Sequence, residues 1–302
     1  MVDDDHKAQS PRYRREEPSD AAASLSESLA KGKILSVSPL PDTSDPWIRR
    51  FRTHPEATAR LLCFPHAGGS ATYYNPLAHS PTLPPETDVL AVQYPGRQDR
   101  RRERFMDNIP ELADRITTAL APYIDRPLVF FGHSMGAVLA FEVAQRLREQ
   151  QESRLAWLFV SGRRAPSRFR KGTVHLLGDA ELTDELRRIG GTDPLFLDDE
   201  ELMAEILPVV RNDYRAVEQY RWTPSQRLGC PITALAGDRD KQTAPDDVAA
   251  WQQHTEGPFD LHVFSGGHFY LDTHQQAVVD LISEALVDVA EQQLETTKGS
   301  AQ

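Results

Sequence analysis

Short runs of apolar, β-branched and aromatic residues alternate with helical patterns along most of the chain. Six of these runs predict strands, at residues 60–64, 88–94, 127–132, 155–161, 231–236 and 259–264. Between them apolar residues recur three and four positions apart, as at Ile109, Leu112, Ile116 and Leu120, which is the stripe of a helix that covers a sheet. Strands that alternate with helices favour an α/β fold with a mostly parallel, doubly wound sheet.

The alternation is interrupted after the fourth predicted strand. About 70 residues separate Ser161 from Ile232, far more than one crossover helix needs. Within this segment one amphipathic helix is indicated by Leu182, Leu186 and Ile189. The stripe that follows indicates a pair of helices interrupted at Pro208, because proline favours the first turn of a helix. We expect residues 168–222 to form a helical lid inserted into the sheet domain.

The two ends of the chain lack a sustained apolar period. Residues 1–45 mix charge, Ser, Pro and Ala, and cannot bury enough apolar surface to offset the entropy of ordering. Residues 291–302 are polar and are expected to form a flexible tail. The sequence therefore predicts a disordered extension over 1–45, a single folded domain over 46–290 and a flexible tail over 291–302.

Charge and cysteine content narrow the classes of function. The 302 residues contain 34 Lys and Arg against 45 Asp and Glu, a formal charge of −11, which disfavours nucleic acid as a partner. The two cysteines are too few for a disulfide framework, so a reducing cytoplasm is expected. The chain has no apolar run long enough to span a membrane, and its charged first 20 residues do not resemble a signal peptide.

The sharpest motif is Gly132-His133-Ser134-Met135-Gly136, directly after a predicted strand and directly before a helical pattern. This context is that of a nucleophile elbow, a turn so tight that the serine projects above the sheet. Small residues on both sides let the backbone pass without steric clashes. Ser134 is the predicted nucleophile.

A serine hydroxyl needs a base to take its proton, and a carboxylate to orient that base. His268 follows the last predicted strand, in Gly266-Gly267-His268, where binding groups gather in such sheets. His274 is the rival, although its neighbours look like the start of a helix. Two acids follow the fifth predicted strand, and Asp240 is favoured over Asp238, which is better placed to brace the turn.

An oxyanion hole in this fold uses the backbone N–H after the serine and one from an early strand-to-helix loop. Met135 supplies the first of these amides. The second is expected from the glycine-rich segment FPHAGGS at residues 64–70, with Ala67 as the candidate.

The motifs FPHAGGS, QYPGR, GHSMG, GDRD and GGHFYL stand in this order over the folded region. This set resembles type II thioesterases, the stand-alone α/β-hydrolases that accompany polyketide and nonribosomal peptide synthases, over residues 57–290. The resemblance implies a Ser134, Asp240 and His268 triad with oxyanion amides at Ala67 and Met135. It implies removal of short acyl groups from the phosphopantetheine thioester of an acyl or peptidyl carrier protein, without a metal or other cofactor.

Three interpretations are left open at this stage. A general carboxylesterase would share the triad, and a non-catalytic binding protein would share the fold. The arginine-rich stretch QYPGRQDRRRERF is either a solvated loop or a docking site for an acidic carrier protein. The residues proposed for docking are Arg97, Arg100, Arg101 and Arg102.

Overall fold

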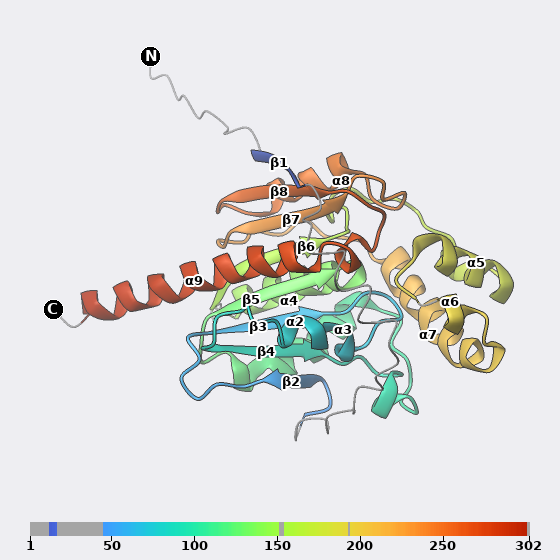
Figure 1. Ribbon diagram of the computed structural model, residues 1–302, viewed down its shortest axis with the longest axis horizontal. Coiled ribbons are helices and arrows are strands. Elements are labelled where there is room, and N and C mark those ends of the chain that lie inside the picture. Colours follow the sequence, from blue (N-terminus) through green and yellow to red (C-terminus); the bar gives the residue numbers. More distant parts are fainter. Residues whose placement is uncertain (1–11, 17–44, 151–153, 193, 301–302) are drawn as a thin grey trace, which may run out of the picture.

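The computed structural model describes residues 12–16, 45–150, 154–192 and 194–300, and within them the chain forms one eight-stranded sheet (Figure 1). The strands lie in the order β1-β8-β7-β6-β5-β3-β4-β2, and all neighbours are parallel except β2 and β4. Their bounds are β1 Arg12–Glu16, β2 Ile48–Arg52, β3 Ala59–Phe64, β4 Thr87–Val92, β5 Leu128–His133, β6 Leu155–Ser161, β7 Ile232–Gly237 and β8 Phe259–Phe264. The six strands predicted from apolar runs are confirmed as β3 to β8.

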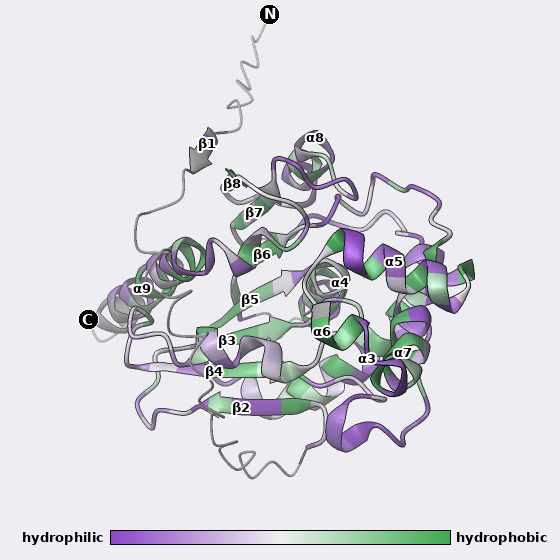
Figure 2. Cartoon of the chain, turned by 45° about the vertical axis from the view of Figure 1, so that its right-hand side comes forward, coloured by the Kyte–Doolittle hydropathy of each residue, from purple (hydrophilic) through white to green (hydrophobic). Residues whose placement is uncertain are grey.

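Helices cover both faces of this sheet. One buried cluster joins α3 (Ile109–Leu120), α4 (Met135–Glu149) and α8 (Pro245–Ala249) to one face, and a second joins α2 (Asn75–Ala78) and α9 (Gln275–Ser300) to the other. Alternate residues of a strand enter opposite clusters, as Leu62 and Leu61 do. In Figure 2 the central strands β3 and β4 are accordingly mostly hydrophobic, whereas the long helices α7 and α9 alternate between hydrophobic and hydrophilic residues. The predicted doubly wound α/β fold is confirmed.

Pairing in the centre of the sheet brings the two glycine-rich motifs together. β3 and β5 are neighbours, and Phe64 at the end of β3 pairs with Gly132 near the end of β5. The segments that follow these residues therefore leave the sheet side by side, at its carboxyl edge. This is the edge where ligands bind in open α/β sheets.

The amino-terminal extension differs from the prediction. Residues 12–16, expected to be disordered, form β1 and pair in parallel with β8, Arg12 opposite Asp260 and Glu16 opposite Phe264. Backbone pairing to an otherwise open strand edge needs no apolar period, so the hydrophobic pattern gave no sign of it. The rest of the predicted extension, apart from Asp45, lies outside the described residues.

Two further elements were not expected. β2 pairs antiparallel with β4 at the opposite edge of the sheet, although IRRFR carries three arginines. Helix α9 extends to Ser300, through most of the segment predicted to be a flexible tail (Figure 1). Val289 is buried, and glutamate, glutamine, leucine and lysine in the turns after it are good helix formers.

The inserted segment forms a lid of three helices, α5 (Asp179–Ile189), α6 (Pro194–Leu197) and α7 (Glu200–Gln219). Its own small core contains Leu182, Leu186, Leu197, Met203, Leu207 and Val210. The predicted break at Pro208 is wrong, because α7 continues through this residue. Pro208 and Ala204, whose carbonyl loses its partner, are both exposed, while Leu207, Val209 and Val210 are buried and hold the helix on its other side.

Candidate active site

Ser134 lies at the turn between β5 and α4, with φ 54° and ψ −114°, a conformation that non-glycine residues seldom adopt. The turn is so tight that a Cβ on Gly136 would lie 1.9 Å from the carbonyl oxygen of Phe64. A Cβ on Gly132 would lie 2.3 Å from the oxygen of Gly136. Both flanking positions therefore require glycine, and the predicted elbow is present.

His268 and Asp240 form a buried pair at the ends of β8 and β7. His268 Nδ1 lies 2.7 Å from Asp240 Oδ2, and the two residues are 6% and 8% exposed. The second oxygen of Asp240 accepts a hydrogen bond from the Gln242 N–H at 2.8 Å, which fixes the carboxylate. Nδ1 thus faces the acid, and Nε2 is left for another partner.

The rival residues have other roles. Asp238 Oδ1 accepts a hydrogen bond from the Gly266 N–H at 2.9 Å, so this carboxylate braces the turn, as predicted. His274 Nε2 lies 2.8 Å from the carbonyl oxygen of Ser265 and packs at the start of α9. The structure pairs Asp240 with His268 and leaves Asp238 and His274 outside the pair.

The two predicted oxyanion amides are unoccupied donors. Among hydrogen bonds between described residues, none uses the N–H of Ala67 or that of Met135. Met135 is the first residue of α4, so its amide lies at the positive end of the helix dipole. Ala67 lies in the loop after β3, beside Gly68, whose φ of 77° suits glycine.

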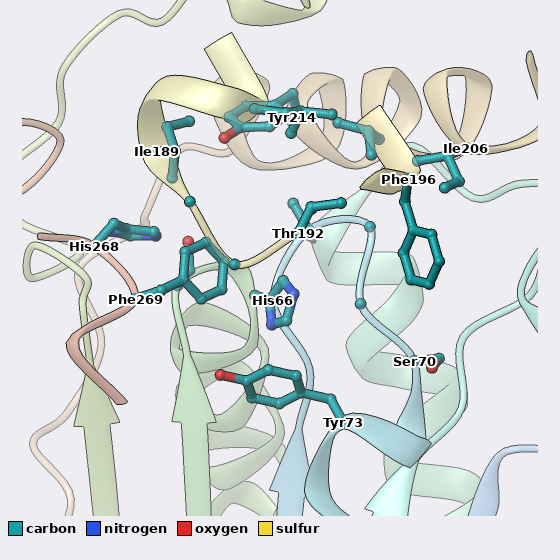
Figure 3. Close-up of a pocket in the computed structure, with 18 of the residues that line it drawn as sticks. His66, Ser70, Tyr73, Ile189, Thr192, Phe196, Ile206, Tyr214, His268 and Phe269 are labelled. Carbon is teal, nitrogen blue, oxygen red and sulfur yellow. The ribbon is translucent and has the colours of Figure 1, made fainter. Parts of the chain in front are cut away.

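A cavity of about 410 Å³ joins these elements, and both Ser134 and His268 line it. The lid forms one wall, through Ile189 at the end of α5, Gly190, Gly191 and Thr192 directly after it, Phe196 on α6, and Ile206, Val210 and Tyr214 on α7. Figure 3 shows the lid side of the cavity, with Ile189, Thr192, Phe196, Ile206 and Tyr214 labelled, opposite His66 and Tyr73 of the core, and His268 and Phe269 at one side. The site is a part-apolar chamber between lid and sheet.

Two histidines near His268 were not singled out from the sequence. Burial, then the charges of His268 and Arg97, lower the pKa of His66 to about 3. Burial also lowers the pKa of His133 well below its usual value, and its ring lies 5.0 Å from that of His268. Both rings are therefore neutral near pH 7. His66 sits inside the FPHAGGS motif, so its place beside Ala67 was the signal that could have identified it.

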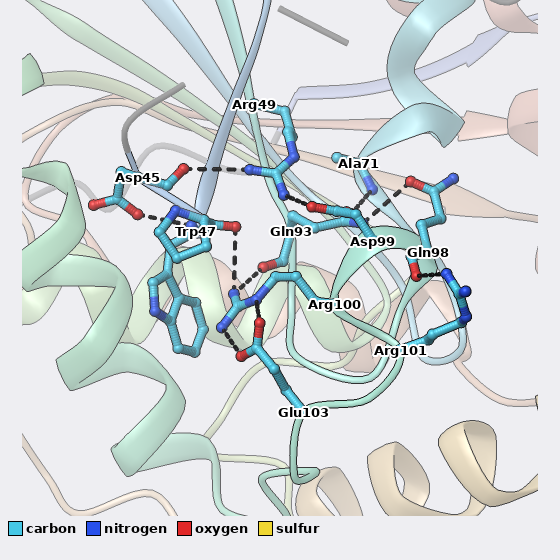
Figure 4. A network of polar contacts seen from close by, with 11 residues as sticks. Asp45, Trp47, Arg49, Ala71, Gln93, Gln98, Asp99, Arg100, Arg101 and Glu103 are labelled. Carbon is cyan, nitrogen blue, oxygen red and sulfur yellow. Dashed lines mark hydrogen bonds and ion pairs between the residues drawn. The ribbon is translucent and has the colours of Figure 1, made fainter. Parts of the chain in front are cut away.

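The four arginines proposed for docking lie in two different environments, two of them buried and two exposed. Arg97 is buried in an ion pair with Asp213 of α7, so its proposed docking role is wrong. Arg100 is also buried: it pairs with Glu103 at 2.6 Å, donates to the Gln93 carbonyl and covers the Trp47 ring (Figure 4). The motif therefore supports the fold at these two positions, whereas Arg101 and Arg102 are exposed.

Other reactive groups lie apart from this site. Burial raises the pKa of Cys230 to about 12 and that of Cys63 further, so both thiols stay protonated. In the described part of the chain, no three histidine, cysteine or acidic side chains gather where they could bind a metal ion. Nor is any helix there long and apolar enough to cross a bilayer.

Comparison with known proteins agrees with this geometry. A model of the thioesterase domain family matches residues 59–286. Thioesterase PikA5 of Streptomyces venezuelae is 47% identical over 250 residues, which cover 82% of this chain and 88% of the relative.

Two solved structures are similar over most of their length. The type II thioesterase BorB from the borrelidin biosynthetic cluster superposes with a TM-score of 0.75 at 52% identity, over 81% of this chain and 99% of BorB. RedJ, a thioesterase of the prodiginine pathway of Streptomyces coelicolor, superposes with a TM-score of 0.72 at 37% identity, over 76% and 91% of the two chains. The chain therefore belongs to the thioesterase family of the α/β-hydrolase fold, among the type II thioesterases of polyketide and nonribosomal peptide pathways.

Proposed function

We propose that this thioester hydrolase removes stranded short acyl groups from the phosphopantetheine arm of acyl or peptidyl carrier proteins, with Ser134 as nucleophile. One observation carries the proposal: the strained Ser134 and the buried His268–Asp240 pair meet at a single chamber that the lid covers. Relatives from polyketide and nonribosomal peptide pathways supply the context for the substrate.

In the proposed reaction, Ser134 Oγ attacks the thioester carbonyl while His268 Nε2 takes its proton. Asp240 holds the imidazole through Nδ1 and stabilises its charged form. The tetrahedral oxyanion accepts hydrogen bonds from the N–H groups of Ala67 and Met135, and its collapse breaks the C–S bond. His268 returns its proton to the departing sulfur, so that the pantetheine thiol leaves and the imidazole is neutral again. Water, activated by His268, then frees the acyl group from Ser134 as a carboxylic acid.

The neutral neighbours of His268 favour this chemistry. Because His66 and His133 do not carry charge near pH 7, they do not repel the imidazolium that forms at His268. A thiol with a pKa of about 8.5 leaves with little help from an acid, whereas an amide nitrogen must be protonated. Thioesters are therefore better substrates for this site than peptides.

The reaction needs no cofactor beyond the pantetheine arm that the substrate itself carries. An acyl carrier or peptidyl carrier protein is the proposed partner, and a cytoplasmic location fits such a partner and the two free cysteines. Nucleic acid and membrane have no part in the proposal.

The carboxylesterase alternative is tested by comparing kcat/KM for a short acyl group carried on a pantetheine thiol and the same group carried as an oxygen ester. The proposal expects the thioester to be strongly preferred. Equal rates on both substrates, abolished together by Ser134→Ala, would favour a general esterase instead. A chain that binds acyl-pantetheine without hydrolysing it would be a binding protein.

A further inference from the structure

A buried ion pair lies where helix α7 of the lid meets the loop that carries Ala67. Asp213 of α7 pairs with Arg97, and their side chains are only 2% and 5% exposed. Neither residue lines the catalytic chamber. The pair therefore lies behind the lining of the chamber.

The same carboxylate also binds the backbone of the loop. Asp213 Oδ2, the oxygen that faces Arg97, accepts a hydrogen bond from the Gly68 N–H at 2.7 Å. Loop and helix are in direct contact here, because a Cβ on Gly68 would lie 2.7 Å from Val210 Cγ2. Arg97 in turn donates from Nε to the Gly69 carbonyl at 3.4 Å and from Nη1 to the Pro95 carbonyl at 2.7 Å.

These bonds fix the peptide planes on both sides of Ala67. The His66 carbonyl, which shares a plane with the Ala67 N–H, accepts from the Gly69 N–H at 3.0 Å. The next plane is held by the bond from the Gly68 N–H to Asp213. With both planes held, the free N–H of Ala67 keeps a single direction, and an oxyanion donor depends on such fixed direction.

We propose that Asp213 is a positioning residue: through Gly68 and Arg97 it orients the Ala67 N–H toward the oxyanion and makes that orientation depend on the docking of α7. This inference rests on the proposed function, in which Ala67 is an oxyanion donor. It also explains why an acid interrupts the apolar stripe of α7, three residues after Val210. A hydrophobic residue there would leave the Gly68 N–H without its acceptor and the buried Arg97 without its counter-charge.

The first test removes the acceptor with Asp213→Ala. The loss of a well-placed oxyanion donor costs about 10²- to 10³-fold in kcat, so we expect a decrease of roughly 10²-fold on a small acyl-pantetheine thioester with KM changed by less than about threefold. The matched control is Arg215→Ala, two residues later on α7, because Arg215 is exposed and pairs with Asp107 at 3.7 Å, not with the loop or with Asp213. We expect the control to keep kcat within about twofold.

A second variant separates positioning from stability. Arg97→Met/Asp213→Leu replaces the buried pair with apolar side chains of similar size, which removes the uncompensated charge that Asp213→Ala leaves behind. We expect this protein to fold with a Tm near that of the wild type and still to lose kcat. If Asp213→Ala does not fold, the double variant decides the question.

A positioning role and a purely structural role are separated by comparing how the substitution changes the affinity for two inhibitors. An acyl trifluoromethyl ketone forms an oxyanion when Ser134 adds to it, whereas an acyl-pantetheine thioether resembles only the bound substrate. We expect Ki for the ketone to rise in parallel with the loss of kcat/KM, and Kd for the thioether to stay unchanged. Folded variants with wild-type kcat, or an equal loss of affinity for both inhibitors, would overturn the inference.

The Ser134→Ala variant distinguishes a failure of the positioning role of Asp213 from a failure of the proposed function. If that variant is inactive and does not capture the ketone while the Asp213 variants are fully active, positioning by Asp213 fails and the proposed function stands. If Ser134→Ala retains wild-type hydrolysis, the proposed function itself fails.

Discussion

At the scale of single residues, the sequence indicated the candidate site residues but not the buried contacts around them. Ser134, His268 and Asp240 were candidates because an elbow and two strand ends have recognisable local patterns, and the structure places Ser134 and the His268–Asp240 pair at one cavity. The contact between Asp213 and Arg97 could not be predicted, since it spans 116 positions of sequence and no local pattern reports it. A charged residue within an apolar helical stripe was the one sign available.

The assignment of the acid predicts different outcomes for two asparagine variants. Asp240→Asn should lower kcat by about 10⁴-fold, because the amide favours the wrong tautomer of His268. Asp238→Asn keeps an oxygen that can accept from the Gly266 N–H and should cost little activity. Steady-state kinetics of both proteins, each checked for folding by circular dichroism, would refute the assignment if the order of the two losses were reversed.

A buried histidine away from the site predicts a dependence of stability on pH. Burial, then the charge of Arg227, lowers the pKa of His254 to about 4. As the pH falls below about 6.5, this histidine therefore becomes protonated in the unfolded chain while it stays neutral in the folded one. The free energy of unfolding should therefore fall as the pH drops from 6.5 toward 4, by at most about 1.4 kcal/mol per pH unit from this group.

The His254→Phe variant isolates this contribution. Phenylalanine can occupy the same aromatic surroundings, beside Phe141, Trp222 and Trp251, but cannot titrate. Urea unfolding at pH 7.5 and at pH 5 should show a smaller loss of stability for the variant than for the wild type. Identical losses in the two proteins would show that His254 is not the group responsible.

At the scale of elements, the apolar runs gave the central strands because these are buried on both faces. The edge strands β1 and β2 were not predicted because both are rich in arginine and neither contains a run of apolar residues, although each pairs with a neighbouring strand. The continuity of α7 through Pro208 was missed for a related reason: tertiary contacts on the buried face, at Val209 and Val210, outweigh a local preference.

We predict that α5 is the more mobile part of the lid and that α7 is the fixed part. α5 packs mainly on other lid elements and ends at Gly190 and Gly191, both with positive φ, where the backbone can change direction at low cost. α7 is anchored by Asp213 and by Ala216 and Val217, which enter the main core. Hydrogen exchange should thus be faster in α5 than in residues 209–219 of α7.

Mass spectrometry of peptides after timed exchange in deuterated buffer measures this difference. Peptides from β5 serve as the internal reference for the protected core. Equal protection of α5 and β5 would contradict a lid that opens at α5.

At the scale of the whole molecule, a net charge of −11 opposes encounter with an acidic carrier protein, so any attraction must be local. Arg101 and Arg102 remain exposed beside Gln98, which donates to Thr72 at the wall of the chamber at 2.7 Å. Arg101→Ala/Arg102→Ala should raise KM for an acyl carrier protein and weaken its salt dependence, because the Debye length falls from about 10 Å at 0.1 M to about 3 Å at 1 M.

Hydrolysis of a small uncharged acyl thioester provides the comparison, and it should be nearly unaffected by the double substitution. Arg115→Ala, at an exposed arginine on α3 that does not line the chamber, is the matched control. An equal loss on the carrier and the small substrate would mean that these arginines support the pocket, and docking at this stretch would be abandoned.

The most direct test of the central claim is mass spectrometry, of the intact proteins and of their proteolytic peptides, after rapid quenching of the enzyme with a propionyl carrier protein. The account predicts a transient propionyl adduct on the peptide that contains Ser134, followed by free propionate and a carrier lighter by the acyl group. Ser134→Ala should form no adduct and leave the carrier acylated, with the rate reduced by at least about 10³-fold. Deacylation by Ser134→Ala at the wild-type rate, or an adduct on a different residue, would contradict it.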